Sequence, residues 1–543
     1  MDDAGTGKRL PPGVSAREFA RALAAWKAIV GERWVFSSEE DLDLYRDAYS
    51  PFWDEPEERR AAAAVAPDSV EQVQRILRVA NESGIPVYPV STGRNLGYGG
   101  AAPTYSGSVV LDLKRMNRVL AVDEVNANCL VEPGVSYFDM YRHLKATGSK
   151  LWIDVPDPGW GSLIGNALDH GGGYTAPAYR NHFEAHCGME IVLADGEILR
   201  TGMGALPGAE TWQQYKFSFG PSLDGLFKQS NYGVVTKMGF WLFPEPEAYF
   251  SGTVLTPRHD DIVKIVEIFN YLENTMAVHG LPSMYSPAYP MLPSTDPELL
   301  ALHAAPGGAD PAALQAWADR KGLPFWTCSL KFYGAPNVVR ALWDAAKARF
   351  GAIPGAKFKD GELIPLPLTP EQIARVHKPE FGIPSLEMFY IGARSETNPN
   401  PTNGHFWFSP IIPRTGAAVI EANRVIRRTA HELGLPLLMF SPPVGSWSRA
   451  FILVLAMPIT RVPEEDRRLR AAVKQLIRVC AEHGWGEYRT APAFMDTVMD
   501  VYSYNDHILR RVDERIKDAL DPKGILSPGR YGIWPRHLRG ERR

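Results

Sequence analysis

The chain has 543 residues, of which 45% are hydrophobic and 22% charged, so it is long enough for two or three globular domains. A formal net charge of −4 excludes a basic field for nucleic acid or an anionic membrane, and four scattered cysteines supply neither a C-x-x-C zinc site nor a disulfide framework. The first residues lack the apolar core of a signal peptide, and no apolar run reaches about eighteen residues, so we expect a soluble, cytoplasmic protein without a metal.

Two helices and two strands are predicted near the start of the chain. The segment 15–31 opens with a capping box (S-x-x-E) and closes on a glycine. The segment 68–84 has apolar residues at helical spacing and also closes on a glycine. Residues 85–90 (IPVYPV) and 107–113 (GSVVLDL) have the short, β-branched composition of strands.

A glycine-rich loop, STGRNLGYGG, occupies residues 91–100 between these strands. Its four glycines allow the backbone to approach a ligand closely. It has neither the lysine of a Walker A loop nor the G-x-G-x-x-G pattern, and no long helix follows it as in a Rossmann unit. This part of the chain therefore indicates an α+β domain.

Further stretches rich in small residues lie at 159–173, 229–233 and 524–532. A β-hairpin is predicted at 189–202, with its turn at Asp195-Gly196. Because such loops lie near both ends of the chain, we expect one domain to use both ends and a second domain to be inserted. Several loops that converge on one ligand indicate a large cofactor in an extended pose.

The pattern changes after a proline-rich boundary at 244–250, where helices begin to alternate with strands. Residues 259–273 have a helical pattern, and residues 325–334 have the pattern of a strand. A Pro, Ala and Gly-rich connector at about 288–312 is predicted to be an ordered loop or a lid. The predicted fold class of the whole chain is α+β.

Three groups of polar residues have both a structural and a functional interpretation. His182 and His186 have the i, i+4 spacing of a zinc helix, but no glutamate directly follows the first histidine, so a hydrogen-bonded turn is the better interpretation. Tyr488 and Arg489 alone would indicate surface or interdomain packing, unless another phenol joins them at an anion site. His405 alone would be a satisfied structural histidine.

Taken in order, these segments resemble one family, the FAD-dependent oxidases and hydroxylases of para-substituted phenols. Vanillyl-alcohol oxidase, eugenol oxidase and p-cresol methylhydroxylase are its best-known members. The resemblance spans about residues 60–535 and is carried by GRNLGYGGAAP, LWIDVPDPGWGSLIGNA, GMEIVLADGEILRTGMGALP, FGPSLDGLFKQSNYGVVTKMGFWLFPEPE, HFWFSPI and LSPGRYGIWP. Within the family the chain is placed nearest the vanillyl-alcohol oxidase and eugenol oxidase branch.

The resemblance implies a two-domain FAD-linked oxidase fold. Residues 1–247 and 487–543 would form an FAD-binding domain of the p-cresol methylhydroxylase type, and residues 248–486 an α+β substrate cap. The loop 91–100 would hold the pyrophosphate, because successive backbone N–H groups form an anion-binding concavity. The resemblance also implies a homodimer or an assembly of dimers.

The resemblance further implies a set of site residues. Tyr98, Tyr488 and Arg489 match a phenol site in which two phenolic O–H groups and a permanent cation bind a phenolate and lower its pKa. Asp157 matches a carboxylate near flavin N5, a base or electrostatic tuner, with turn capping as the alternative. The residues expected to bind FAD are Ser91, Thr92, Gly93, Arg94, Asn95, Leu96, Gly97, Pro156, Asp157, Gly161, Ser162, Gly165, Asn166, Gly173, Tyr174, Gly233, Val234, His405 and Arg530.

His405 matches the histidine that members of the oxidase branch attach to the flavin 8α-methyl group. The p-cresol methylhydroxylase branch uses a tyrosine a few residues upstream. That region is longer in this chain, and Gly392 stands near the aligned position with Tyr390 close to it. We expect covalent attachment of FAD through His405, with Tyr390 as the alternative.

Three features depart from the family pattern. The segment 47–63 lacks the histidine that assists flavin attachment in vanillyl-alcohol oxidase. The segment 437–451 has no acidic residue or histidine where relatives carry them, and its Met439, Phe440 and Trp447 predict a more apolar wall. Trp160 adds bulk near the expected flavin position.

The expected function is the oxidation of 4-alkyl, 4-allyl or 4-hydroxymethyl phenols. The resemblance implies hydride loss from the benzylic carbon to flavin N5, a p-quinone methide intermediate, and O₂ as the electron acceptor that is reduced to H₂O₂. One alternative is a hydroxylating 4-alkylphenol dehydrogenase that passes electrons to a cytochrome. An alternative from another class is a non-catalytic flavin- or phenol-binding protein.

Overall fold

The computed structural model describes residues 9–95, 97–290, 294–305, 309–387, 404–435, 445–447 and 449–542, with the backbone alone at 445–447 and 541. Five residues named above lie outside this range, as does the side chain of Trp447: Leu96, Tyr390, Gly392, Met439 and Phe440. Within the described residues no helix is both long and apolar enough to cross a membrane.

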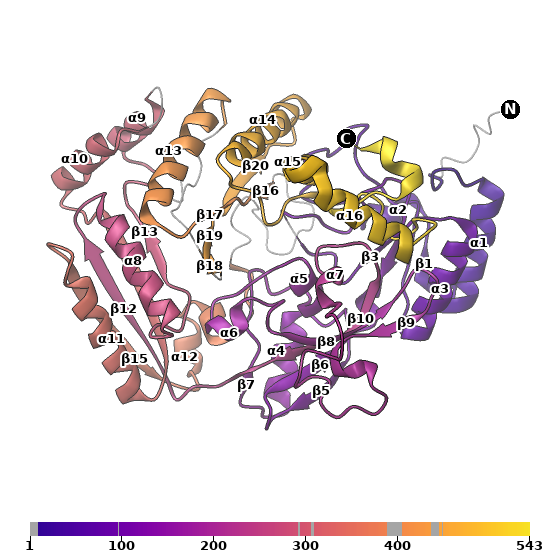
Figure 1. Ribbon diagram of the computed structural model, residues 1–543, viewed down its shortest axis with the longest axis horizontal. Coiled ribbons are helices and arrows are strands. Elements are labelled where there is room, and N and C mark those ends of the chain that lie inside the picture. Colours follow the sequence, from indigo (N-terminus) through magenta and orange to yellow (C-terminus); the bar gives the residue numbers. More distant parts are fainter. Residues whose placement is uncertain are drawn as a thin grey trace.

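The first part of the chain builds two sheets (Figure 1). A four-stranded sheet has the order β1 (Val35–Phe36), β2 (Ala63–Val65), β4 (Val109–Asp112) and β3 (Val87–Val90), and helices α1 (Ala16–Val30) and α3 (Val70–Ser83) pack on it. A five-stranded antiparallel sheet has the order β5 (Val119–Asp123), β6 (Asn128–Val131), β10 (Val234–Trp241), β8 (His186–Val192) and β9 (Ile198–Arg200). Shorter elements surround these sheets: α2 (Glu39–Asp43), α4 (Tyr137–Ala146), β7 (Leu151–Trp152), α5 (Leu163–Leu168), α6 (Pro177–Arg180), α7 (Asp224–Phe227) and β11 (Phe243–Pro244).

The middle of the chain builds a second, larger core. A four-stranded antiparallel sheet has the order β13 (Ser283–Tyr285), β14 (Trp326–Gly334), β12 (Ala248–Thr256) and β15 (Lys357–Pro365), and helices α8 (Asp261–Asn274) and α11 (Pro336–Phe350) pack on it (Figure 1). The remaining elements are α9 (Pro297–Ala304), α10 (Pro311–Lys321), α12 (Pro370–Ile373), β16 (Gly404–Phe408), β17 (Ile411–Pro413), α13 (Gly416–Glu432), β18 (Gly445–Trp447), β19 (Ala450–Ile452), β20 (Leu455–Ile459) and α14 (Pro463–Glu482).

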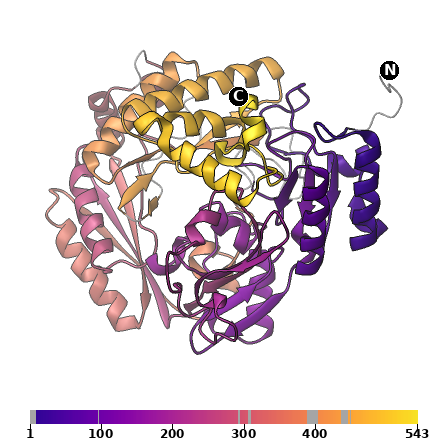
Figure 2. The same ribbon diagram turned by 45° about the vertical axis from the view of Figure 1, so that its right-hand side comes forward.

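The C-terminal segment returns to the first sheet, as Figures 1 and 2 show for the yellow helices α15 (Met495–Val501) and α16 (Tyr504–Leu520). The N–H of Val87 donates to the carbonyl of Ile525 at 2.7 Å, and the N–H of Ser527 donates back to Val87 at 2.8 Å. The C-terminal segment is therefore an additional edge of the β1-β2-β4-β3 sheet. The domain boundaries at 247/248 and 486/487 stay predictions.

The predicted α+β class is confirmed, and most local predictions agree with the structure. The capping box of Ser15 and Glu18 opens α1, and the hairpin with Asp195-Gly196 joins β8 to β9. Helix α3 begins at Val70, two residues later than predicted, because the Ser69 side chain accepts the N–H of Gln72 and caps the helix.

The connector at 288–312 was predicted to be a loop or lid, and this was wrong for its middle part. Residues Pro297–Ala304 form helix α9. Asp296 caps the helix and a proline occupies its first turn. These two residues are a signal for a helix N-terminus, which the overall Pro, Ala and Gly content of the connector does not show.

Candidate active site

A cavity of about 390 Å³ lies where the glycine-rich loop after β3, helix α5, the 169–174 loop and the C-terminal segment meet. Predicted site residues from separate parts of the chain line it together: Ser91, Thr92, Gly93, Arg94, Asn95, Tyr98, Pro156, Asp157, Gly161, Ser162, Gly165, Asn166, Gly173, Tyr174, Gly233, Val234, Tyr488, Arg489 and Arg530. Gly97 and His405 lie beside Trp407, which lines the cavity itself.

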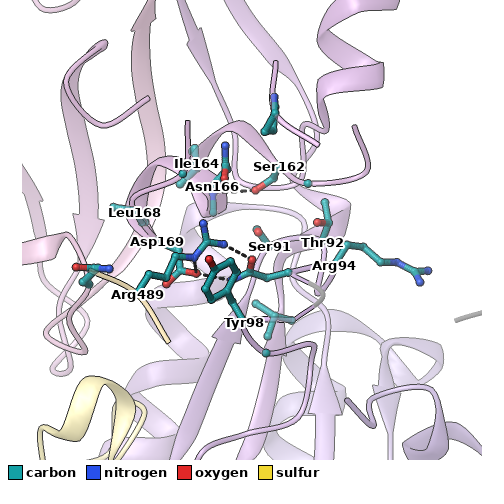
Figure 3. Close-up of a pocket in the computed structure, with 18 of the residues that line it drawn as sticks. Ser91, Thr92, Arg94, Tyr98, Ser162, Ile164, Asn166, Leu168, Asp169 and Arg489 are labelled. Carbon is teal, nitrogen blue, oxygen red and sulfur yellow. Dashed lines mark hydrogen bonds and ion pairs between the residues drawn. The ribbon is translucent and has the colours of Figure 1, made fainter. Parts of the chain in front are cut away.

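The glycine-rich loop turns Tyr98 into the cavity. Gly97 and Gly99 have φ values of +85° and +114°, which a residue with a Cβ rarely adopts. A Cβ on Gly99 would also fall 2.8 Å from Pro492. Arg94, by contrast, points away from Tyr98 and Arg489 in Figure 3 and stacks on Trp160, with its guanidinium 5.2 Å from the ring.

Tyr98, Tyr488 and Arg489 form one cluster, as the resemblance implied. The guanidinium carbon of Arg489 lies 3.8 Å from the ring centroid of Tyr98 (Figure 3), a cation–π distance. The Tyr98 hydroxyl lies 2.8 Å from Oγ of Ser409. Burial, and then the adjacent Tyr488 phenol, raise the pKa of Tyr98 well above its usual value. Tyr98 therefore keeps its proton and can donate a hydrogen bond.

Asp169 completes this cluster and was missing from the predicted site. Its carboxylate pairs with Nε of Arg489 at 2.8 Å and with Nη2 of Arg530 at 3.3 Å, and it also accepts hydrogen bonds from Asn95 and Tyr531. Burial alone would raise the pKa of Asp169. The guanidinium groups of Arg489 and Arg530 lower it by more than burial raises it, so the net pKa is below its usual value. Asp169 is therefore an anion.

The cluster of Arg489, Arg530 and Asp169 carries two positive charges and one negative charge, hence one surplus positive charge. The nearby imidazole of His170 adds no further charge to this cluster. Its ring lies 5.9 Å from that of Tyr488, and burial, followed by Lys228 and Arg489, lowers its pKa to about 4. A buried site with one surplus cation is suited to a single anionic group.

A second polar pair lines the cavity at Asp157. The Tyr174 hydroxyl donates to Oδ2 of Asp157 at 2.6 Å. The other carboxyl oxygen is buried and has no hydrogen-bond partner among the described residues. Burial raises the pKa of Asp157 despite the Tyr174 bond and the nearby His377. Asp157 is thus a carboxyl group with one oxygen available to a ligand.

His405 lies on β16, buried between two aromatic rings. Its ring centroid is 4.4 Å from that of Trp407 and 5.0 Å from that of Tyr49. Tyr49 belongs to the segment 47–63, in which the sequence lacks the histidine expected from relatives. A tyrosine from this segment therefore occupies the space beside His405.

His182 and His186 point to different partners. Nε2 of His182 lies 2.7 Å from Asp154, and Nε2 of His186 lies 3.0 Å from Asp224. Across the described parts of the chain, no three His, Cys, Asp or Glu side chains gather as metal ligands would. Both histidines are buried and bonded within the fold, His186 at the start of β8 and His182 in the segment before it.

Sequence reasoning missed Asp169, Ser409, Trp407 and Tyr531. Asp169 had a usable signal, because it is the one carboxylate within the glycine-rich run ALDHGGGYT. Ser409 directly follows the strand of His405 and had no comparable signal, since a serine beside a proline is usually a turn residue.

Comparisons with known proteins agree with this geometry. A family model described as an FAD binding domain matches residues 61–202. The flavoprotein subunit of 4-cresol dehydrogenase (hydroxylating) from Pseudomonas putida is 32% identical over 538 residues, which cover 96% of this chain and 97% of that protein. The 1'-carboxy-chondrochloren decarboxylase of Chondromyces crocatus is 30% identical over 96% of this chain and 99% of its own length.

The solved structure of 4-ethylphenol oxidase from Gulosibacter chungangensis, in its isoeugenol complex, superposes with a TM-score of 0.82. Its sequence is 35% identical, and the match covers 98% of this chain and all of that one. The predicted two-domain FAD-linked fold is confirmed by this likeness together with the matching FAD binding domain.

Proposed function

Because the chain belongs to the p-cresol methylhydroxylase and vanillyl-alcohol oxidase family of FAD-dependent oxidoreductases, we propose that it oxidises para-substituted phenols. The observation that carries the proposal is the cluster of Tyr98, Tyr488 and Arg489 in the cavity, where Arg489, Arg530 and Asp169 together carry one surplus positive charge. Full-length similarity alone does not carry it, since one similar protein is a decarboxylase.

The cavity fits FAD. The backbone of residues 91–95 lines it, and successive N–H groups of this glycine-rich loop can hold a diphosphate. Gly165 has no room for a side chain, because a Cβ there would overlap Oγ of Ser91. When bound, FAD supplies the acceptor for the electrons of the substrate.

The chain's own residues would hold and ionise the phenol. Arg489 and the hydroxyl groups of Tyr98 and Tyr488 would bind the phenolic oxygen, and the surplus charge lowers the pKa of a phenol bound there. An electron-rich phenolate that loses hydride from the benzylic carbon attached at its para position becomes a neutral p-quinone methide. The site would thus stabilise the anion from which hydride leaves.

Asp157 has the properties of a proton acceptor in this proposal. Its free carboxyl oxygen faces no partner among the described residues, and burial keeps its pKa above the usual value. Such a carboxyl would take the proton of a water that adds to the quinone methide, or of a 4-hydroxymethyl group.

Anaerobic mixing with p-cresol, 4-ethylphenol, eugenol and vanillyl alcohol tests the reaction. We expect at least one of these phenols to bleach the visible absorbance of the bound flavin. Benzyl alcohol, which lacks the phenolic oxygen, should leave it unchanged. If no para-substituted phenol bleaches the flavin, the chain is a binding protein and the proposal is wrong.

We further propose O₂ as the electron acceptor, with a cytochrome as the alternative, and covalent attachment of FAD through His405. Rapid mixing of reduced protein with air-saturated buffer separates the two acceptors, and slow reoxidation would favour the cytochrome. Protein denatured on a gel should keep flavin fluorescence, and His405→Ala should abolish it. Fluorescence that persists in this variant would point to Tyr390 instead.

The two-domain division and a homodimer complete the proposal. Light scattering of the holoprotein measures the oligomeric state, and a monomer at micromolar concentration would contradict the dimer.

A further inference from the structure

We propose that Ser409 is a positioning residue of the phenol site, which turns the hydroxyl proton of Tyr98 toward the substrate. This inference rests on the proposed function. Ser409 lies outside the sequence segments that carry the phenol cluster and the glycine-rich loop, and it acts through Tyr98.

The geometry places the two hydroxyl groups in direct contact. Oγ of Ser409 lies 2.8 Å from the hydroxyl of Tyr98, and either oxygen can be the donor. Ser409 is fully buried, and Tyr98 is 7% exposed. Bulk water therefore does not compete for this hydrogen bond.

Counting protons decides which group donates when a substrate is bound. Each hydroxyl has one proton. If Tyr98 gives its proton to Ser409, a lone pair of Tyr98 faces the negatively charged substrate oxygen. If Ser409 gives its proton to Tyr98, the Tyr98 proton is left for a second acceptor, which is the adjacent Tyr488 phenol without substrate and would be that oxygen when substrate is bound. A phenolate thus selects Ser409 as the donor, and a donated bond also makes Tyr98 a stronger donor.

Two backbone contacts hold Ser409 in this position. Its N–H donates to Oε1 of Glu487 at 3.1 Å, and its carbonyl accepts the N–H of Tyr488 at 3.4 Å. Pro410 and Glu487 form an antiparallel bridge. Ser409 therefore joins the segment that carries Tyr488 to the hydroxyl of Tyr98, so that one residue fixes both phenols relative to each other.

Ser409 also lies on the continuation of the strand that carries His405. Strand β16 ends at Phe408, and the Ser409 N–H bond to Glu487 begins directly after it. The same chain segment thus places the expected flavin attachment residue and the residue that orients the substrate donor.

If Ser409 only stabilised the fold, its replacement would weaken phenolate binding equally with and without the Tyr98 hydroxyl. A double-mutant cycle distinguishes this structural role from the positioning role. The variants are Ser409→Ala, Tyr98→Phe and the pair together, with Ser108→Ala as control. Ser108 is equally buried, its hydroxyl donates to the carbonyl of Tyr105 at 2.7 Å, and neither residue is among those that line the cavity. Each variant is used as holoprotein with FAD content measured.

The ligand is 4-fluorophenol, which carries fluorine instead of a benzylic carbon at the para position and so cannot lose a benzylic hydride. Its ¹⁹F resonance reports whether the bound phenol is ionised, and titration gives the affinity for the phenolate. We expect Ser409→Ala to weaken phenolate binding about tenfold, the size of one hydrogen bond to a charged group, and to raise the pKa of the bound phenol. Ser108→Ala should change neither.

The cycle supplies the decisive result. In the Tyr98→Phe background, Ser409→Ala should change phenolate binding less than about twofold, because the hydroxyl on which it acts is absent. Ser409→Thr, which keeps the hydroxyl, should restore binding. Ser409→Cys, with a similar volume and a weak S–H donor, should give an intermediate loss and serves if the alanine variant does not fold.

An equal loss in both Tyr98 backgrounds, or unchanged phenolate binding in Ser409→Ala, would overturn the inference while leaving the proposed function intact. If wild-type holoprotein binds no 4-fluorophenol and no phenol bleaches its flavin, the proposed function fails, and the inference fails with it.

Discussion

Replacement of Glu487 by glutamine should make the protein more stable at alkaline pH. The Glu487 carboxyl is only 5% exposed, and one of its oxygens has no hydrogen-bond partner among the described residues. Burial raises its pKa from the usual 4.5 to about 8, although Thr490 and the Ser409 N–H act in the opposite direction. Tyr502 and Cys480 also face it, and both are neutral at these pH values.

The sign and size of the effect follow from proton linkage. The unfolded chain releases the Glu487 proton near pH 4.5, whereas the folded protein holds it until about pH 8. Between these values the folded state binds more protons, so the free energy of unfolding falls as pH rises. At about 1.4 kcal/mol per pKa unit the loss reaches at most about 5 kcal/mol above pH 8.

Glutamine has the shape of glutamic acid and does not titrate. It can still accept the N–H of Ser409, so Glu487→Gln removes the pH-dependent loss and little else. We therefore expect the difference in unfolding midpoint between variant and wild type to grow in favour of the variant from pH 5.5 to pH 8.5.

Thermal or urea unfolding of both holoproteins across this pH range measures the difference. Glu482→Gln, an exposed change on the neighbouring helix, is the control and should show a constant difference. A midpoint difference for Glu487→Gln that stays flat with pH, or that falls, would contradict a raised pKa of Glu487. It would mean that Glu487 is ionised in the folded protein at neutral pH.

Three further substitutions test the site. Arg489→Lys should lower kcat/KM for phenols at least about 100-fold without loss of flavin, because an ammonium group cannot keep the forked contacts of a guanidinium, and unchanged kinetics would remove Arg489 from the site. Gly97→Ala should abolish covalent flavin on a denaturing gel, since its Cβ would fall 2.6 Å from the indole of Trp407 and 3.3 Å from His405. Asp157→Asn should lower kcat about 100-fold with KM nearly unchanged, measured with vanillyl alcohol, because the Tyr174 bond can persist while the proton acceptor is lost; a larger change in KM than in kcat would argue for a binding role instead.

Much of the fold was open to prediction from local sequence, because the chemistry that decides it lies within a few residues. The hydroxyl of Ser15 and the carboxyl of Glu18 cap the first helix from three residues apart. Asp195 and Gly196 form the turn of a hairpin that pairs adjacent segments. The glycine-rich loop likewise indicated a ligand site from ten consecutive residues.

The net charge of the candidate site and the contact between the Tyr98 and Ser409 hydroxyl groups depend on the tertiary structure alone. Asp169 meets Arg489 and Arg530 across more than three hundred residues, and Ser409 meets Tyr98 across a similar separation. Local sequence records none of these approaches, because they follow from how two cores pack and where the C-terminal segment pairs with β3. From the sequence, the family resemblance predicted that two tyrosines and an arginine would gather at a phenol site. The packing determined that they lie beside the carboxylate of Asp169 and the hydroxyl of Ser409, because these contacts join segments more than three hundred residues apart.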